Sequence, residues 1–213
     1  MDDAIKTVAV VDDQPDNRKQ LSAAVADVDL GVWCPAGPFA TMEPLLAEVR
    51  HQSQAALFDH DLTAGGYAGC TGAEAVAALV RGSGFPAVLV TRKSETSMPA
   101  IRAHLRWIPM WLHRREADGD RLLEAWQYCR QEIQSHFLAR REPVRVSLWF
   151  ESLDKAMSEI VVPAWNPEEV VAYPIDQLPE HIRARATPGF QCYAKANLGA
   201  RCSEELYICD FED

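Results

Sequence analysis

Acidic and polar side chains follow several of the short apolar runs in the first part of the chain. Carboxylates that gather in one crevice repel one another and attract a hard cation, for which Mg²⁺ with oxygen ligands is the usual choice. A carboxylate beside such a cation can attack a phosphoryl group, because the metal neutralises the developing charge. A hydroxyl nearby can then donate a hydrogen bond to the product's oxygens. The residues that could do this chemistry are Asp12, Asp13, Asp59, Asp61, Thr91 and His113.

The elements that must position these side chains can be read from hydrophobic periodicity. Short apolar runs that end in polar residues indicate buried strands, and apolar positions at helical spacing indicate helices between them. Thr71 and Glu74 have the spacing of a capping box at the start of one helix. The analysis predicts strands over 8–11, 31–34, 55–58, 86–91 and 108–112, with helices from Pro15, over 42–49, from Thr71, from Ser97 and after Asp118 or Asp120, the last carrying Leu122, Trp126, Cys129, Ile133 and Phe137.

Strands that alternate with helices predict βαβ units and a parallel sheet. We therefore expect a doubly wound (βα)5 fold of the flavodoxin-like type. In such a sheet the ligand site lies outside the carboxyl ends of the strands, where all the side chains named above would converge. The simpler interpretation is that each acid only caps the helix that follows it. Four acids and a threonine at one edge of the sheet favour a ligand-binding site over helix capping alone.

Four segments of the chain have a distinctive order and spacing: Val-Ala-Val-Val-Asp-Asp (8–13), Ala-Leu-Phe-Asp-His-Asp-Leu (56–62), Thr-Gly-Ala-Glu (71–74) and Val-Leu-Val-Thr (88–91). With these segments the chain resembles the receiver domain of bacterial two-component response regulators, over roughly residues 5–138. By that resemblance Asp59 is the phosphate acceptor, Asp12, Asp13 and Asp59 hold Mg²⁺, and Thr91 is the switch hydroxyl. A histidine kinase and a downstream target would be the protein partners.

Two departures from the receiver pattern concern the same pocket. The family has a lysine after the fifth strand, which this chain lacks; His113 or Arg114 could substitute for it, although neither is an equivalent point charge on a flexible stem. The loop Thr63–Gly72 contains four glycines and could cover or reshape the pocket. Asp61 stands where receivers tune dephosphorylation, so we expect its carboxylate to orient the attacking water. The missing lysine also supports an alternative, a degenerate pseudo-receiver that acts as an adaptor without phosphate.

A phosphatase is the second alternative. The segment 57–63 also resembles the first motif of haloacid-dehalogenase-type phosphatases, in which Asp59 would be the nucleophile and Asp61 the general acid and base. Thr91 would then supply the second-motif hydroxyl. That family places its nucleophile strand first, whereas here Asp12 and Asp13 precede it. The chain order therefore favours a signalling protein over an enzyme.

The alternation of strands and helices ends at Arg140–Pro143, which predicts two domains, 1–140 and 143–213. The second is expected to be a small α+β domain with a final hairpin over 190–196 and 206–211 and a helix within 178–186. It has a net charge of −7 and no basic recognition helix, so a DNA-binding output is not expected. The basic stretch at 92–115 suggests that the first domain docks on this acidic second domain within the same molecule. We expect the protein to act through protein–protein contacts.

Composition limits the remaining possibilities. The chain has 213 residues, a net charge of −10, 48% hydrophobic and 24% charged residues, which is typical of folded proteins and unfavourable for binding nucleic acid. No apolar run is long enough to span a bilayer and no secretory signal opens the chain, so we expect a cytoplasmic protein without membrane contact. Six cysteines without a CxxC pair do not indicate a zinc or redox site.

Overall fold

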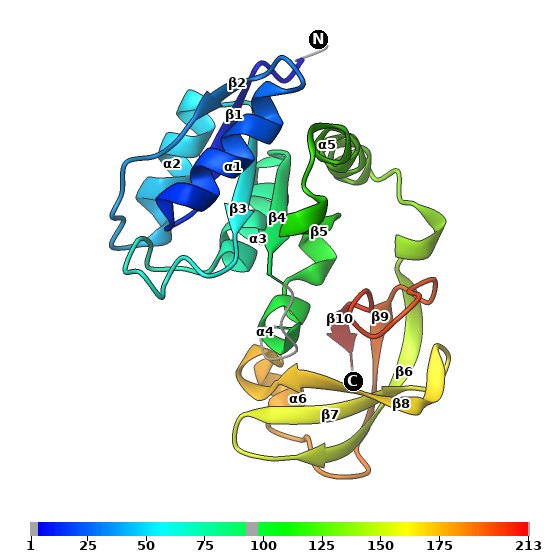
Figure 1. Ribbon diagram of the computed structural model, residues 1–213. Helices are drawn as coiled ribbons and strands as arrows, with labels where there is room; N and C mark the ends of the chain where they lie inside the picture. The colour runs from blue at the N-terminus through cyan, green and yellow to red at the C-terminus, as the bar shows by residue number, and fades with distance from the viewer. Residues whose placement is uncertain (1–3, 93–97, 213) are drawn as a thin grey trace. The chain divides into compact units, whose positions relative to one another are not determined.

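The computed structural model describes residues 4–92 and 98–212, and the chain divides into two compact units (Figure 1). The first consists of Met1–Lys93 and Trp107–His136, and the second of Ser94–Arg106 and Phe137–Asp213. The second unit therefore includes a segment from within the stretch that the sequence assigns to the first domain. Its place in the fold is described below.

The first unit contains a parallel sheet of five strands in the order β2-β1-β3-β4-β5. This order, with the first two strands exchanged and the rest in sequence, is the flavodoxin-like arrangement, so the predicted fold class is confirmed. The strands are β1 (Thr7–Val11), β2 (Gly31–Trp33), β3 (Ala55–Asp59), β4 (Ala87–Thr91) and β5 (Trp111–His113).

Strands β1, β3 and β4 read as continuous apolar runs because helices cover both of their faces. Two helices contact each other and pack on the face formed by alternate strand residues such as Val10, Leu57 and Val90. Two other helices also contact each other and cover the opposite face (Figure 1). The first pair is α1 (Pro15–Ala26) and α5 (Gly119–Ile133), and the second is α2 (Met42–Gln52) and α3 (Gly72–Ser83).

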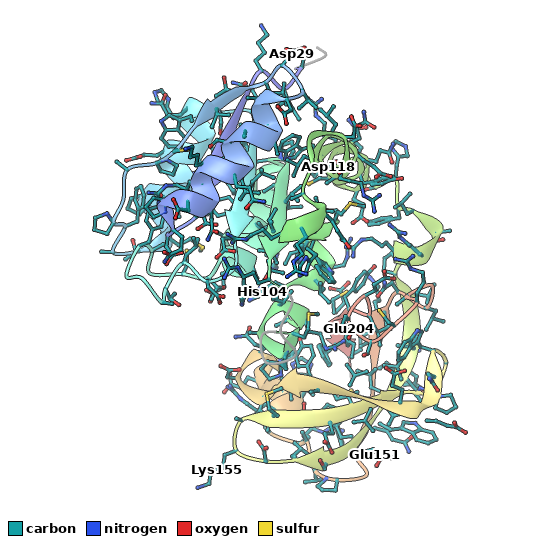
Figure 2. All side chains as sticks on the ribbon, in the orientation of Figure 1. Asp29, His104, Asp118, Glu151, Lys155 and Glu204 are labelled. Carbon is teal, nitrogen blue, oxygen red and sulfur yellow. The ribbon has the colours of Figure 1, made fainter. Side chains whose placement is uncertain are left out.

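The predicted helix starts are largely confirmed. The Thr71 hydroxyl accepts a hydrogen bond from the Glu74 amide at 3.3 Å, and the Glu74 carboxylate accepts one from the Thr71 amide at 2.7 Å, which completes the capping box of α3. Asp118 caps α5 through the Arg121 amide (2.9 Å) and is labelled in Figure 2. Ser97, where we expected a helix to begin, lies outside the described residues.

Helix α5 is shorter than the apolar spacing suggests. It ends at Ile133, and Ser135 adopts a left-handed conformation with φ of 64°. Phe137, which continues the helical spacing in the sequence, belongs to the second unit instead. The left-handed residue reverses the chain and ends the helix before the hydrophobic pattern does.

The second unit is an antiparallel sheet in the order β10-β9-β6-β7-β8. The last two strands pair antiparallel, as the hairpin prediction required. Apolar residues of one sheet face, including Leu148, Phe150 and Ile160, form a core with Ile182. The elements are β6 (Val144–Leu153), β7 (Met157–Val162), β8 (Asn166–Pro174), α6 (Glu180–Arg183), β9 (Gln191–Ala196) and β10 (Ile208–Glu212), with 3-10 turns η3 (Ala139–Arg141) and η4 (Ile175–Gln177).

A short helical segment from between β4 and β5 is part of this second unit. It consists of α4 (Met98–Arg102) and the 3-10 turn η1 (Leu105–Trp107), whose last residue returns to the first unit. Helix α4 contacts β8, and Ala103 packs against the core of the antiparallel sheet. In Figure 1 this green helix lies beside the yellow and orange elements of the later sequence. Among the described residues, no helix is both long and apolar enough to cross a bilayer.

Candidate functional site

Three aspartates meet at the carboxyl edge of the parallel sheet. Asp12 directly follows β1, and Asp59 is the last residue of β3, on the strand that pairs with β1. With Asp13 they offer carboxylate oxygens that all lie within 4.8 Å of one another. Asp12 is fully buried, Asp59 is nearly so, and Asp13 is half-buried. The structure therefore brings together the three residues that we expected to hold Mg²⁺.

A buried arginine lies among these carboxylates. Nη2 of Arg114 donates to Oδ2 of Asp12 at 2.9 Å and also contacts Oδ1 of Asp59. The Arg114 side chain is 7% exposed, so both ion pairs are shielded from water. Its Nε and Nη1 are buried and have no hydrogen-bond partner among the described residues. The guanidinium thus keeps two donors for an additional acceptor.

The structure places the side chain of Arg114, and not that of His113, among the three carboxylates. His113 ends β5 and is half-buried, and its Nδ1 accepts a hydrogen bond from the Arg115 amide at 3.2 Å. That bond caps the 3-10 turn η2 (Arg114–Glu116), which begins at Arg114. The turn changes the direction of the chain after the strand, so a pattern of alternating side chains does not indicate which of the two residues enters the site.

Backbone and side-chain donors hold the two buried carboxylates. Oδ1 of Asp12 accepts from the Gln14 amide at 2.8 Å and from Asn17 Nδ2 at 3.3 Å. Oδ2 of Asp59 accepts from the Asp61 amide at 3.0 Å. Each carboxylate therefore has one oxygen fixed by local hydrogen bonds and its other oxygen directed to Arg114. This division orients both groups before any ligand binds.

The site has more negative charge than Arg114 compensates. Burial raises the pKa of Asp59, and the neighbouring Asp12 raises it further, while the Arg114 charge acts in the opposite direction. A raised pKa means that the ionised carboxylate is disfavoured where it stands. A divalent cation would relieve that repulsion. The three oxygen ligands fit such an ion, although one guanidinium nitrogen already contacts two of the three carboxylates.

Thr91 lies at the same sheet edge as the three aspartates, whereas the Asp61 carboxylate is not grouped with them. Thr91 is the buried last residue of β4, one position beyond Val90, which pairs with Asp59. It therefore stands at the same edge of the sheet. Asp61 is exposed, and its backbone amide, not its carboxylate, makes the contact with Asp59. The carboxylate of Asp61 is not one of the three grouped around Arg114.

The glycine-rich loop before α3 covers one side of the site. A Cβ atom at Gly65 would lie 2.5 Å from Oδ2 of Asp13, so any other residue there would require the loop or the Asp13 carboxylate to move. Tyr67 anchors the loop, because its hydroxyl donates to the Pro35 carbonyl at 2.8 Å and its ring lies 5.8 Å from the Arg18 guanidinium. Arg18 in turn donates to the carbonyl of Asp12. Arg18 therefore contacts both the loop, at Tyr67, and the segment directly after β1, at Asp12.

Sequence reasoning did not anticipate the environment of His60. Its place beside two aspartates suggests a metal ligand, and alternation along the strand end, which points it away from Asp59 and Asp61, favours a surface or loop role instead; in the structure His60 is buried, and burial lowers its pKa. His60 is buried because the start of α3 covers it. Gly72 of that helix approaches so closely that a Cβ there would meet the Asp59 carbonyl oxygen at 1.9 Å. Nδ1 of His60 has no partner among the described residues.

Several solved structures are similar to this chain over about 60% of its length. They include the signal receiver domain of a modulated diguanylate cyclase from Desulfovibrio desulfuricans G20, with 16% identity, 62% of this chain and 98% of that chain covered, and a TM-score of 0.48. The N-terminal domain of a response regulator/sensory box/GGDEF 3-domain protein from Carboxydothermus hydrogenoformans has 18% identity, coverages of 61% and 98%, and a TM-score of 0.45.

The chemotaxis response regulator CheY4 of Vibrio cholerae has 19% identity, coverages of 59% and 99%, and a TM-score of 0.41. No protein-family model matches this chain, and no curated protein matches it. Each of these three matches covers about 60% of this chain and nearly all of the other chain.

Proposed function

We propose that this chain is a response-regulator-like signalling protein that accepts a phosphoryl group on Asp59. The observation that supports this most strongly is the buried guanidinium of Arg114, placed on Asp59 and Asp12 beside Asp13. The site then contains a nucleophilic carboxylate, three oxygen ligands for a metal and a fixed cation. These are the groups that phosphoryl transfer to a carboxylate requires.

In the proposed reaction Oδ1 or Oδ2 of Asp59 attacks the phosphorus of an acyl phosphate or a phosphohistidine. The new O–P bond forms as the bond to the donor breaks, and the donor leaves with that electron pair. Mg²⁺, when held by Asp12, Asp13 and Asp59, would neutralise charge on the phosphoryl oxygens. The two unpaired donors of Arg114 would then bind those oxygens, and the Thr91 hydroxyl would donate to another.

Release of the phosphoryl group would depend on Asp61. Its exposed carboxylate stands two residues beyond the acceptor, where it can orient a water molecule for attack on phosphorus. The partners that this scheme implies are proteins: a histidine kinase as phosphodonor and a downstream target whose binding changes with phosphorylation. Protein contacts, not DNA binding, would carry the output.

The intact mass of the protein after incubation with Mg²⁺ and acetyl phosphate tests this function. We expect wild type to gain the mass of one phosphoryl group and Asp59→Asn to gain none. Arg114→Lys, which keeps the positive charge and supplies the lysine of the receiver pattern, should still form the adduct. A wild-type protein that remains unmodified while acetyl phosphate stays intact would contradict the proposal.

A degenerate pseudo-receiver adaptor is the second candidate, and one observation favours it. Arg114 already contacts both Asp12 and Asp59, and the loop at Gly65 lies against Asp13, so each of the three metal ligands has a protein neighbour. An unmodified protein that binds no Mg²⁺ and still binds its partner would support this candidate. Release of inorganic phosphate without a stable adduct would instead support phosphatase activity through Asp59 and Asp61.

A further inference from the structure

The antiparallel sheet of the second unit has one face that does not contribute to its hydrophobic core. Side chains alternate between the two faces along a strand, and Leu148, Ile160 and Cys192 point into the core. Their neighbours therefore point the other way, and two of these, Trp149 and Tyr193, are 45% and 42% exposed. We call this side of the sheet the outer face, and it carries Ser147, Trp149, Val161, Val170, Gln191 and Tyr193.

The backbone pairing places a row of side chains across the outer face. Val161 of β7 lies opposite both Val170 of β8 and Trp149 of β6. Trp149 also lies opposite Gln191 of β9, and Tyr193, two residues further along β9, is its diagonal neighbour. Directly opposite and diagonal side chains on one face of an antiparallel pair are close enough to interact. Exposed aromatic and aliphatic side chains are therefore grouped on this face.

One aromatic ring of the outer face already carries a cation. The Arg145 guanidinium carbon lies 3.8 Å from the centroid of the Tyr193 ring, and Nε of Arg145 contacts the Glu212 carboxylate at 2.8 Å. This arginine is stacked on an aromatic ring and paired with a carboxylate at the same time. A guanidinium suits both interactions because it is planar, charged and weakly hydrated. An arginine is thus the kind of group that this face can hold.

Trp149 has the same kind of surroundings without a cation. Glu159 of β7, two residues from Val161, is a diagonal neighbour of Trp149 on the outer face. The Glu159 carboxylate accepts a hydrogen bond from the Ser152 hydroxyl, which directs it toward β6. Within the part of the chain that the structure describes, no cation lies over the Trp149 ring and Glu159 makes no ion pair. A positive charge from another molecule would complete the arrangement.

The remaining charge on this side of the second unit is negative. Arg145 and Lys195 of the outer face already contact carboxylates at 2.8 and 3.0 Å. Glu151, labelled in Figure 2, is exposed and makes no ion pair among the described residues. A second copy of the chain would bring the same carboxylates against each other, whereas a basic segment would compensate them. The charge therefore favours a basic partner over self-association.

We propose that the outer face binds an arginine-containing basic segment of a partner protein, with one guanidinium stacked on Trp149 and paired with Glu159. Val161 and Val170, in the same row, extend the apolar surface for the aliphatic part of that segment. The inference goes beyond the proposed phosphorylation of Asp59, because every residue that it uses belongs to the second unit.

Fluorescence anisotropy of a labelled arginine–glycine peptide, titrated with the full chain at low salt, tests the proposal. The matched probe is the same peptide with citrulline in place of arginine, which keeps the shape of the side chain and removes its charge. We expect the arginine peptide to bind at least about tenfold more tightly, and its affinity to fall as salt is added. Equal affinities for the two peptides, or no binding of the arginine peptide, would overturn the proposal.

A pair of variants tests the role of the Trp149 ring. Trp149→Ala should weaken binding of the arginine peptide by about fivefold or more. Val170→Ala, which removes exposed apolar surface from the same face, is the control and should change the affinity by less than about twofold. Both side chains are exposed, so both variants should fold, and their unfolding midpoints check this. Equal losses in the two variants, or none in Trp149→Ala, would contradict stacking on the ring.

A second pair tests the carboxylate and locates the peptide. Glu159→Gln should weaken binding by about threefold or more, whereas Glu48→Gln, which removes an exposed carboxylate from α2 of the first unit, should have a smaller effect. Asp59→Asn should bind as wild type does, so a failure of the proposed phosphorylation leaves this inference standing. A loss in Asp59→Asn as large as that in Glu159→Gln would place the peptide at the acidic site and refute the proposal.

Sedimentation analysis distinguishes the partner from a second copy of the chain. Wild type and Trp149→Ala should sediment alike over a range of protein concentrations, because the outer face is not expected to bind itself. A dimer of wild type that Trp149→Ala dissociates would show that a second copy occupies this face, which would overturn the proposal.

Discussion

Asp12 and Asp59 share one nitrogen of one guanidinium, which sets the electrostatic character of the site. With two carboxylates on Arg114 and Asp13 close by, negative charge exceeds positive charge. The remaining donors of Arg114 favour an anion, and the remaining carboxylate charge favours a cation. A phosphoryl group with Mg²⁺ would satisfy both.

Removal of the Arg114 charge should strongly destabilise the first unit. Arg114→Gln leaves Asp12 and Asp59 buried without a cation, a change that typically costs ~3–5 kcal/mol of unfolding free energy. Urea denaturation measures the loss. The control Arg121→Gln removes an exposed ion pair with Glu124 and should cost only ~0–1 kcal/mol. Similar losses from the two variants would show that Arg114 does not hold the site together.

Asp59 should make stability depend on pH in a defined direction. Its pKa is raised in the folded protein, above an unfolded value of about 3.9. Between those two pKa values the folded state binds more protons, so the contribution of Asp59 is fully present below the unfolded pKa and is lost as pH rises through the folded pKa. Asp59→Asn should therefore gain stability relative to wild type over this window. A stability difference between Asp59→Asn and wild type that stays constant from acid to neutral pH would contradict the raised pKa of Asp59.

At the scale of elements, strand and helix order follows from the sequence because buried parallel strands and capped helices leave clear patterns. Thr71 with Glu74 marked the start of α3, and the apolar runs marked β1 to β4 closely, whereas β5 (Trp111–His113) begins three residues later than the predicted strand 108–112. The choice of Arg114 over His113 was not predictable, because a 3-10 turn begins there and decides which side chain enters the site. The left-handed Ser135 likewise ended α5 without a sequence signal.

The loop at Gly65 should control access of metal to Asp13. In Gly65→Ala the new methyl group would lie 2.5 Å from Oδ2 of Asp13, so the loop or the carboxylate must move. We expect Mg²⁺ affinity to change by about tenfold, or ~1.4 kcal/mol, in calorimetric titration. Gly82→Ala, where an added Cβ has open space within α3, is the control and should leave the affinity unchanged. Equal affinities in all three proteins would contradict this role.

The capping box of α3 should contribute measurably to stability. Thr71→Ala removes the acceptor of the Glu74 amide and should cost ~1 kcal/mol. Thr41→Ala changes the N-cap of α2, whose side chain makes no capping hydrogen bond, and should cost clearly less. Thermal or urea unfolding of the two variants gives the comparison. A larger loss from Thr41→Ala would contradict the assigned cap.

At the scale of the whole molecule, the sequence suggested one boundary near residue 140, but the compact units are not contiguous in the chain. Ser94–Arg106 lies in the second unit, because Arg102 and Arg141 bind carbonyls across a sequence separation that no local pattern reveals. Arg102 belonged to the basic stretch at 92–115 that suggested a docking surface when only the sequence was considered, and Arg141 was not singled out. Their partners are backbone carbonyls, which every residue possesses, and so composition could not identify them.

This arrangement predicts how a truncated chain behaves. A protein that ends at residue 140 lacks the β9–β10 loop that binds Arg102 and the Arg141 side chain that binds Leu105 and Arg106. Trypsin should therefore cleave it after Arg102 and Arg106 at least about tenfold faster than it cleaves the full chain. Cleavage after the exposed Arg50 serves as the reference. Equal rates at Arg102 in the two proteins would show that the second unit does not hold this segment.

The acceptor role of Asp59 is the central claim, and peptide-level mass mapping tests it most directly. After brief incubation of the full chain with Mg²⁺ and acetyl phosphate, the account predicts a single phosphoryl adduct on the peptide that contains Asp59, abolished in Asp59→Asn. An adduct on another residue, or equal modification of the Asp59→Asn protein, would contradict it.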